Sequence, residues 1–240
     1  MSKTLLIAGR ELGAYRRSWL GPIVIAGTLL LDGLSFYNFG LTKPMLSAEA
    51  LGVFFFWAGG IGAVAAVFLS MRLVAEERQT GTITLLNTAP VGEWEIVLGK
   101  FLALLVVVTL MTALTLYIPL WLMVRGKISL GHILVGYLGM ILYAAAVASI
   151  GLFASTLTRS QIVAGVVGGL IAVLMILMFH LGQMVDPPLN QFLSALGIHH
   201  HNFRPFMDGV LKLDCIVYYL SVIFVFLLAA TKSMEARRWR

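Results

Sequence analysis

The sequence predicts an all-α integral membrane protein built on six transmembrane helices. Hydrophobic residues make up 60% of the 240 residues and charged residues only 12%, and the mean hydropathy of +0.94 is far above that of soluble domains. About 20 apolar residues cross the ~30 Å hydrocarbon core of a bilayer as a helix. Six apolar stretches approach or exceed that length. They are Trp19–Phe39, Leu51–Leu73, Val97–Val124, His132–Leu157, Ile162–Leu181 and Cys215–Thr231.

Residues 1–18 precede the first span and are predicted to form an interfacial amphipathic helix. Apolar side chains recur there at intervals of three or four, at Leu5, Ala8, Leu12 and Tyr15. The charged side chains of this segment lie mostly on the other faces, a pattern typical of a helix that lies along a leaflet. A plain cationic flank to the first span is the alternative.

The lysines and arginines fix the predicted orientation. With the N-terminus in the cytoplasm, 12 of the 17 lie on the cytoplasmic side and five on the other, as the positive-inside rule requires. The net charge of +6 therefore reflects membrane topology, and no nucleic-acid partner is predicted. We expect a multi-pass protein of the bacterial inner membrane with both termini and residues 74–96 in the cytoplasm.

No catalytic or nucleotide-binding motif is present in the sequence. It contains neither an HExxH pair nor a GxSxG elbow, and Gly99-Lys100, the nearest approach to a phosphate-binding loop, is followed by Phe101 instead of Ser or Thr. The chain is not expected to be an enzyme or to bind ATP and Mg²⁺ itself. Any work it does must draw on a partner or an ion gradient.

Ionisable residues inside the spans are the usual mark of an ion-coupled carrier. Asp32 in the first span and His180 at the end of the fifth are the candidates. Asp32 is either a pathway residue or a carboxylate that reaches water or a neighbouring helix near the outer mouth. So few ionisable groups give an ion-driven carrier little support.

Two further patterns, one in the fifth span and one between the fifth and sixth spans, invite a functional interpretation. The run His199–His201 does not predict a metal site, because adjacent residues of a helix point about 100° apart, and surface or interfacial histidines are expected. Gly165 and Gly169 form a GxxxG pair in the fifth span, which allows close helix packing and is a candidate subunit interface.

Residues 182–214, between the fifth and sixth spans, are too apolar for an ordinary loop and too interrupted for a span. Their apolar pieces, Leu189–Ile198 and Phe203–Leu213, are separated by Pro and Gly. Each piece either dips into the outer leaflet as a short re-entrant helix or lies on the surface as a loop.

Residues 71–100 carry seven of the 28 charged residues of the chain. The second span is expected to continue past the membrane as a helix through Met71–Arg78, which brings Glu76, Glu77 and Arg78 into water. Glu93 and Glu95 then open the next helix, where acidic side chains suit the positive N-terminal end.

Between these helices, Thr80-Gly81-Thr82 allows a sharp break, because Gly adopts positive φ at little cost. A short apolar piece with Ile83, Leu85 and Leu86 follows and ends at Pro90. A short helix across the cytoplasmic face, with apolar side chains that need cover, predicts a docking element for a soluble partner. A solvated hairpin explains the charges but not these apolar residues.

These residues resemble a known family signature. Glu77–Thr82, Leu85-Leu86, Pro90 and Ile96–Lys100 are similar to the signature of ABC-2-type transporter permeases. The segments Gly136–Gly165 and Phe203–Ser221 resemble the gliding-motility (GldF-like) permease group within that family.

The resemblance implies one ABC-2-type transmembrane domain over residues 1–240, with a cytoplasmic coupling helix between spans two and three and re-entrant helices before span six. Two permease chains would pair, as a homodimer, largely through spans one and five, which gives Gly165 and Gly169 a use. Two separately encoded ATPase subunits, which hold the ATP and Mg²⁺, would dock beneath them. The implied ATPase contacts are Glu76, Glu77, Arg78, Thr80, Gly81, Thr82, Leu85, Leu86 and Pro90, flanked by the helix that carries Leu5, Leu12 and Tyr15.

Two functions remain open from the sequence. The chain is either the permease subunit of an exporter or a membrane anchor that passes ATPase motion to a partner membrane protein without moving a solute. The gliding-motility resemblance keeps the second alternative, together with a membrane-anchored auxiliary protein. The scarcity of polar residues in the spans fits a lipid-like substrate, an apolar one, or none.

Overall fold

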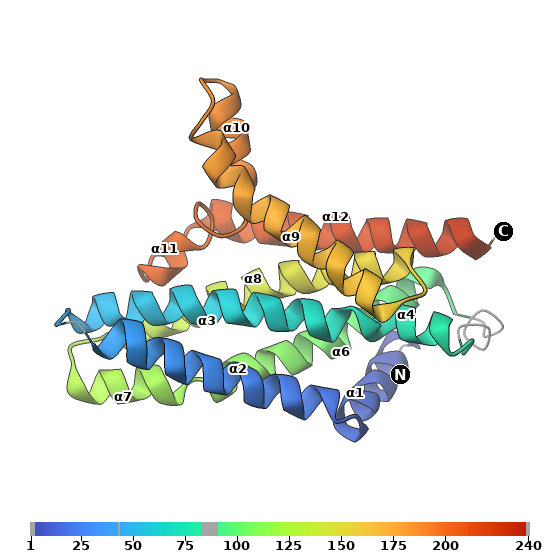
Figure 1. Cartoon of the computed structure of the whole chain (residues 1–240), viewed down its shortest axis with the longest axis horizontal. Coiled ribbons are helices and arrows are strands. Elements are labelled where there is room, and N and C mark those ends of the chain that lie inside the picture. Colours follow the sequence, from blue (N-terminus) through green and yellow to red (C-terminus); the bar gives the residue numbers. More distant parts are fainter. Residues whose placement is uncertain (1–2, 43, 83–90, 239–240) are drawn as a thin grey trace.

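The computed structural model describes residues 3–42, 44–82 and 91–238, and each regular element in these ranges is a helix. The long helices run roughly along one axis, and the two chain ends lie near the same end of the bundle (Figure 1). The helices are α1 (Lys3–Arg17), α2 (Leu20–Phe36, extended by a π-helical turn over Tyr37–Leu41), α3 (Ser47–Ser70), α4 (Arg72–Gln79), α6 (Glu93–Leu114), α7 (Tyr117–Arg125), α8 (Leu130–Leu157), α9 (Gln161–Gly182), α10 (Leu189–Leu196), α11 (Arg204–Met207) and α12 (Leu213–Arg238).

Six helical runs are long and apolar enough to cross a membrane, which confirms the six predicted spans. The second and third runs, Ser47–Gln79 and Glu93–Arg125, have 33 residues each. At a rise of 1.5 Å per residue each is about 50 Å long, well beyond the ~30 Å core. Both runs therefore reach out of the bilayer, and α4 and the start of α6 lie at the end that holds the chain termini (Figure 1).

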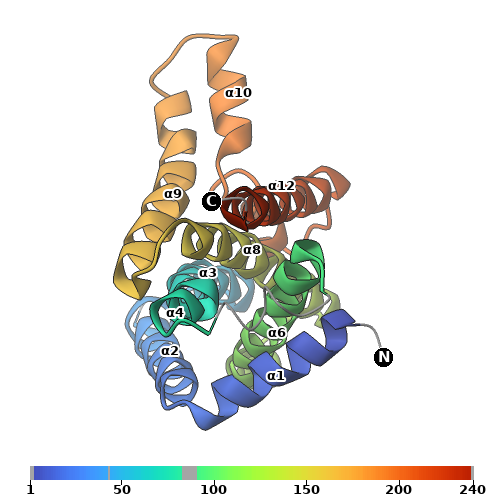
Figure 2. The same cartoon turned by 90° about the vertical axis from the view of Figure 1, so that its right-hand side faces the viewer.

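α8 is the central helix of the bundle and packs against α3, α6, α9 and α12 (Figure 2). Glycines on α8 make this close packing possible. A Cβ on Gly136 would lie 2.1 Å from Phe55 Cζ, and one on Gly139 would lie 2.4 Å from Phe206 Cβ. Both aromatic side chains are completely buried, so α8 binds the second span and the segment before the sixth span into one core.

Residues 182–214 contain two short helices, α10 and α11, before the sixth span. α10 turns back along α9, and the two form a hairpin that projects from the bundle (Figures 1 and 2). Glycines seat the hairpin, because a Cβ on Gly182 would lie 2.9 Å from Ser194 N and one on Gly197 would lie 2.8 Å from Phe179 Cβ. The predicted short helices are therefore present.

The expectation of surface histidines at 199–201 is wrong for His199. Its side chain is only 7% exposed and its ring packs among Phe56, Tyr143 and Phe203. Phe203 stacks on the ring from within the same segment, while Phe56 of α3 and Tyr143 of α8 contact it from other helices, which sequence spacing does not reveal.

Candidate functional site

Three segments meet at the end of the bundle where the chain termini lie. α1 crosses the start of α6, and α4 lies beside both, as Figure 2 shows in an end-on view. Local sequence fixes the start of α6, since the Glu95 carboxylate accepts a hydrogen bond from the Gly92 N–H at 3.1 Å. α4 ends at Gln79, and Gly81 has a φ of +74°, so the break expected after the second span is present.

Lys100 is the centre of this site. Its side chain is completely buried, and its Nζ lies 3.0 Å from Glu11 Oε1 and 2.9 Å from Glu77 Oε1. It also donates to the Leu73 carbonyl at 2.7 Å. Two of the three N–H donors of the ammonium group therefore have acceptors, one on α1 and one on α4, and Glu77 adds an ion pair from α4.

Arg10 adds a second cation to the same carboxylates. Its Nη2 lies 2.8 Å from Glu77 Oε1 and 3.1 Å from Glu11 Oε1. Two cations and two carboxylates make a neutral cluster, which offsets the large cost of removing the Lys100 charge from water. The cluster ties α1, α4 and α6 together, and losing Lys100, Glu11 or Glu77 leaves a buried charge without one of its partners.

A second set of contacts joins α1 to the second span. The Tyr15 hydroxyl donates to the Leu69 carbonyl at 2.6 Å, and the Arg72 guanidinium lies over the Tyr15 ring at 5.1 Å. Burial raises the pKa of the Tyr15 phenol above its ordinary value, so the hydroxyl remains a neutral donor. Arg72 also pairs with Glu76 at 2.9 Å and donates to Ser18 Oγ at 2.9 Å.

Ser155 of α8 occupies the break between α3 and α4. Its Oγ accepts hydrogen bonds from the N–H groups of Val74, at 3.0 Å, and Ala75, at 2.9 Å, and donates to the Met71 carbonyl at 3.0 Å. In an uninterrupted helix the Ala75 N–H would bond to the Met71 carbonyl directly. A side chain inserted into the backbone ladder is a recognised cause of a kink, so α8 sets the direction in which α4 leaves the second span.

Ser155→Ala should lower the stability of the chain by about 1–3 kcal/mol, because two buried N–H groups lose their acceptor. Ser149→Ala is the matched control: it removes a buried hydroxyl from the same helix, but one that bonds only to the Ala146 carbonyl of its own turn. The measurement is the thermal midpoint of each purified variant in detergent. Equal midpoints for the two variants would contradict the inserted hydroxyl.

A cavity of about 360 Å³ opens between α1 and α4, beside the Lys100 cluster. Its walls are mostly charged and include Arg10, Arg17, Arg72, Glu76 and Glu77, with Thr80 and Thr82 at the margin. The cavity thus borders the point where the chain leaves α4 towards residues 83–90. A polar hollow of this kind suits a protein surface with charged side chains more than an apolar ligand.

The predicted contact residues lie on α4, on the segment that follows it and on α1. Glu76, Glu77 and Arg78 lie on α4, where Arg78 donates to the Thr156 carbonyl, and Thr80 caps the end of α4 through the Glu76 carbonyl at 2.9 Å. Gly81 and Thr82 follow directly. Leu85, Leu86 and Pro90 lie outside the described residues. On α1, Tyr15 is buried, Leu12 packs against the core and Leu5 is 53% exposed.

The remaining predicted residues lie away from this site. Gly165 packs within the chain, since a Cβ there would lie 3.0 Å from Met71 Sδ, while Gly169 faces open space. The close approach of α9 to α8 is made by Gly168, where a Cβ would lie 3.1 Å from the Gly151 Cα. Asp32 is buried in α2, and its Oδ1 has no hydrogen-bond partner among the described residues.

Sequence reasoning missed the central residues of the site: Arg10, Glu11, Lys100 and Ser155. The sequence places Lys100 near the start of the third span, within the stretch that resembles the family signature, and predicts no role for Ser155. One signal was available, because Lys100 stands two turns inside a helix that is otherwise apolar from Ile96 onward. An isolated cation at such a depth requires an anionic partner.

Comparison with known proteins agrees with this architecture. A search of the curated proteins found no match. A family described as ABC-2 family transporter protein matches residues 45–223, well over half of the chain. The matched region begins just before α3 and ends within α12, so it contains spans two to five, the first part of the sixth and both short helices. The chain therefore belongs to the ABC-2 family of transporter proteins.

Proposed function

We propose that two copies of this chain form the membrane part of an exporter and that each copy transmits the motion of an ABC ATPase subunit through α4. Membership of the family implies a permease subunit of an ABC transporter, which pairs with such an ATPase and is not normally catalytic itself. Two ATPase copies, which bind ATP and Mg²⁺, would dock at the end of the bundle that holds α1 and α4. We place that end in the cytoplasm of a bacterial cell, beneath the inner membrane, on the lysine and arginine bias.

The Lys100 cluster is the observation that carries the proposal. α4 leads directly into residues 83–90, and Glu77 ties α4 to Lys100 of the third span and Arg10 of α1. An element held by buried ion pairs cannot move alone without leaving charges unpaired. A push on α4 would therefore move α1 and α6 with it, and a differential binding energy of a few kcal/mol suffices to shift a two-state equilibrium.

The exposed faces of α2 and α9 support the pairing of two copies. Only 22% of the most apolar window of the first span and 17% of that of the fifth are buried in the single chain. These two helices lie on the same side of the bundle (Figure 2). Gly169 leaves open space on α9, which allows a neighbouring helix to approach closely. We also propose membership of the gliding-motility group, on the resemblance of Gly136–Gly165 and Phe203–Ser221.

The test is the ATPase activity of the ABC ATPase that co-purifies with the chain, measured after reconstitution of both into vesicles. Gly81→Val should remove most of the stimulation by the permease, because a β-branched residue is strained at a φ of +74°. Gly81→Asn is the matched control, since Asn tolerates this conformation and no atom of the described residues lies within 4 Å of the position of a Cβ. Glu77→Ala should weaken stimulation through the loss of its contacts with Lys100 and Arg10.

All three variants should still insert into the membrane. Normal stimulation by both Gly81→Val and Glu77→Ala would contradict the coupling role of this segment. Stimulation without export of any solute from the same vesicles would favour the alternative function of a membrane anchor that drives a partner protein.

A further inference from the structure

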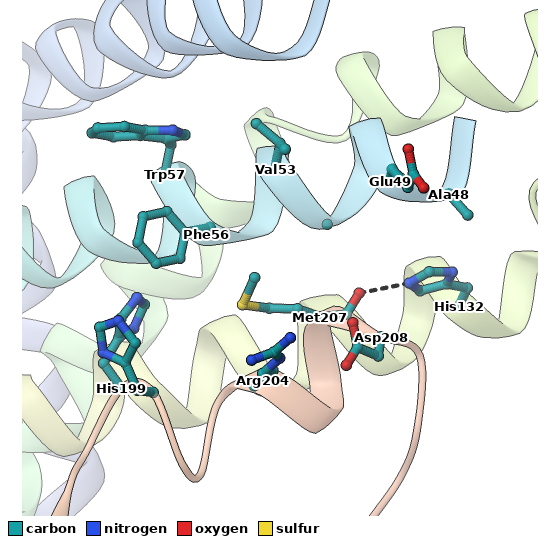
Figure 3. A pocket seen from close by; sticks show the side chains of 12 residues that line it. Ala48, Glu49, Val53, Phe56, Trp57, His132, His199, Arg204, Met207 and Asp208 are labelled. Atoms are coloured by element: carbon teal, nitrogen blue, oxygen red, sulfur yellow. Dashed lines mark hydrogen bonds between the residues drawn. The ribbon is translucent and has the colours of Figure 1, made fainter. Parts of the chain in front are cut away.

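A second cavity lies at the opposite end of the bundle from the Lys100 cluster. It has a volume of about 560 Å³ and is enclosed by the first turns of α3, the start of α8 and the segment from His199 to Asp208 (Figure 3). The Nε2 of His132 lies 2.7 Å from the Met207 carbonyl, which fixes this segment against α8. Nothing in the coupling role described above uses this cavity.

A separate apolar slot of about 420 Å³ lies between α2 and α3 and adjoins this cavity. Phe56, Trp57 and His199 line both of them. We therefore treat the cavity, which carries the charged side chains, as the polar half of one binding region and the slot as its apolar half. The slot follows α3 from Phe56 to Phe68, about 18 Å at 1.5 Å per residue. That length slightly exceeds one leaflet of a ~30 Å hydrocarbon core.

His199 stands at the junction of the two halves. It is 7% exposed, and its Nδ1 is buried without a hydrogen-bond partner among the described residues. Burial lowers the pKa of His199 to about 4, so the ring is neutral at pH 7 and offers one donor and one acceptor. A buried polar atom without a partner is uncommon in folded proteins and marks a position where a ligand group can supply the missing bond.

The charged groups of the polar half are arranged in order along the cavity. In Figure 3, Phe56, Trp57 and His199 lie at one side, Arg204 lies in the middle, and Glu49 and Asp208 lie at the other side. Among the residues that the structure describes, no carboxylate is close enough to form an ion pair with Arg204. One cation followed by two anions complements a head group that carries an anion first and a cation beyond it.

We propose that this space binds a zwitterionic phospholipid-like amphiphile, with an acyl chain between α2 and α3, its phosphate at His199 and Arg204, and its ammonium group between Glu49 and Asp208. The acyl chain would then point towards the middle of the bilayer. The head group would lie at the end of the helix bundle opposite the protein termini. As a statement about cargo, the assignment rests on the proposed transport function. The binding itself does not require an ATPase.

The experiment uses the tryptophan fluorescence of the purified chain in detergent. One variant keeps only Trp57, which lines both halves, and a control keeps only Trp121 of α7, which lines neither. The probes are phosphatidylethanolamine and phosphatidylglycerol with brominated acyl chains, which quench a nearby indole. Phosphatidylethanolamine should quench Trp57 at a roughly tenfold lower concentration than phosphatidylglycerol. The two lipids should quench Trp121 alike.

Head-group variants then test the charge order in the Trp57-only background. Arg204→Gln should raise the concentration of phosphatidylethanolamine needed for quenching by roughly tenfold. Glu49→Gln with Asp208→Asn should remove the preference for phosphatidylethanolamine. The amide oxygen introduced by Glu49→Gln can still accept the hydrogen bond that the Glu49 carboxylate receives from the Leu46 N–H, so the start of α3 keeps its cap.

Three results would overturn the proposal. Equal quenching of Trp57 and Trp121 by both lipids indicates ordinary lipid around the helices, and stronger quenching by phosphatidylglycerol contradicts the zwitterionic head group. Absence of Trp57 quenching shows that another element, such as a second copy of the chain, fills the slot. Because no ATPase is present, failure of the coupling proposal would leave these results unchanged.

Discussion

Lys100→Met should abolish stimulation of the partner ATPase and lower the thermal midpoint of the chain by on the order of 10 °C. Methionine preserves much of the length of the lysine side chain but removes its charge. Glu11 and Glu77, whose side chains are only 13% and 15% exposed, would keep Arg10 as their remaining cation. Breaking a buried ion pair by removing one partner costs about 3–5 kcal/mol. Thermal unfolding of the purified variant in detergent and the ATPase assay in vesicles measure the two effects.

The triple variant Lys100→Met, Glu11→Gln, Glu77→Gln separates stability from transmission. Replacing the buried charges of an ion cluster by neutral groups is often nearly neutral for stability, because the cost of desolvation disappears with the charges. Arg10 keeps its charge in this variant, but its side chain is 53% exposed and reaches water. The triple variant should therefore recover most of the thermal midpoint and still fail to stimulate the ATPase. A single Lys100→Met variant with an unchanged midpoint would show that the cluster does not hold α1, α4 and α6 together.

The six spans could be predicted because the signal is local. Each span needs only an apolar stretch of sufficient length. The distribution of lysine and arginine predicts which ends of the spans face the cytoplasm. The break at Gly81 was also predictable, since a glycine between two threonines after a charged helix end favours a positive φ. The spans and the break depend on neighbours in the sequence, which is why the structure agrees with both. The orientation stays a prediction.

The centre of the coupling site depends instead on a crossing of distant helices. Lys100 is buried only because α1 lies across the start of α6 and brings Glu11 to its ammonium group. No spacing within residues 93–114 indicates that crossing. Ser155 and His199 were missed for the same reason, because their partners lie on other helices. Ser155 bonds to the Met71 carbonyl at the kink after α3, and His199 contacts the rings of Phe56 and Tyr143.

The crossing itself is set by Gly99, the residue before Lys100. A Cβ at this position would lie 2.8 Å from Ile7 Cβ and 2.8 Å from the Thr4 carbonyl oxygen. The second contact is with the backbone of α1, which cannot rotate away as a side chain can. Thr4 and Glu11 are seven residues apart, so they lie on the same face of α1. A larger residue at position 99 must therefore push away the helix that brings Glu11 to Lys100.

Gly99→Ala should lower the thermal midpoint and the ATPase stimulation, and Gly99→Leu should lower both further. Gly9→Ala on α1 is the matched control, because within the described ranges no atom lies within 4 Å of the position of a Cβ there. Both alanine variants gain about 1 kcal/mol of helix propensity, so the difference between them isolates the contact with α1. Release of α1 should also speed tryptic cleavage after Arg16 and Arg17 in the Gly99 variants alone, since cleavage inside a helix requires local opening. Equal midpoints and equal cleavage rates for Gly99→Ala and Gly9→Ala would mean that α1 can shift without loss of stability. The Lys100 cluster would then result from the helix crossing and would not stabilise it.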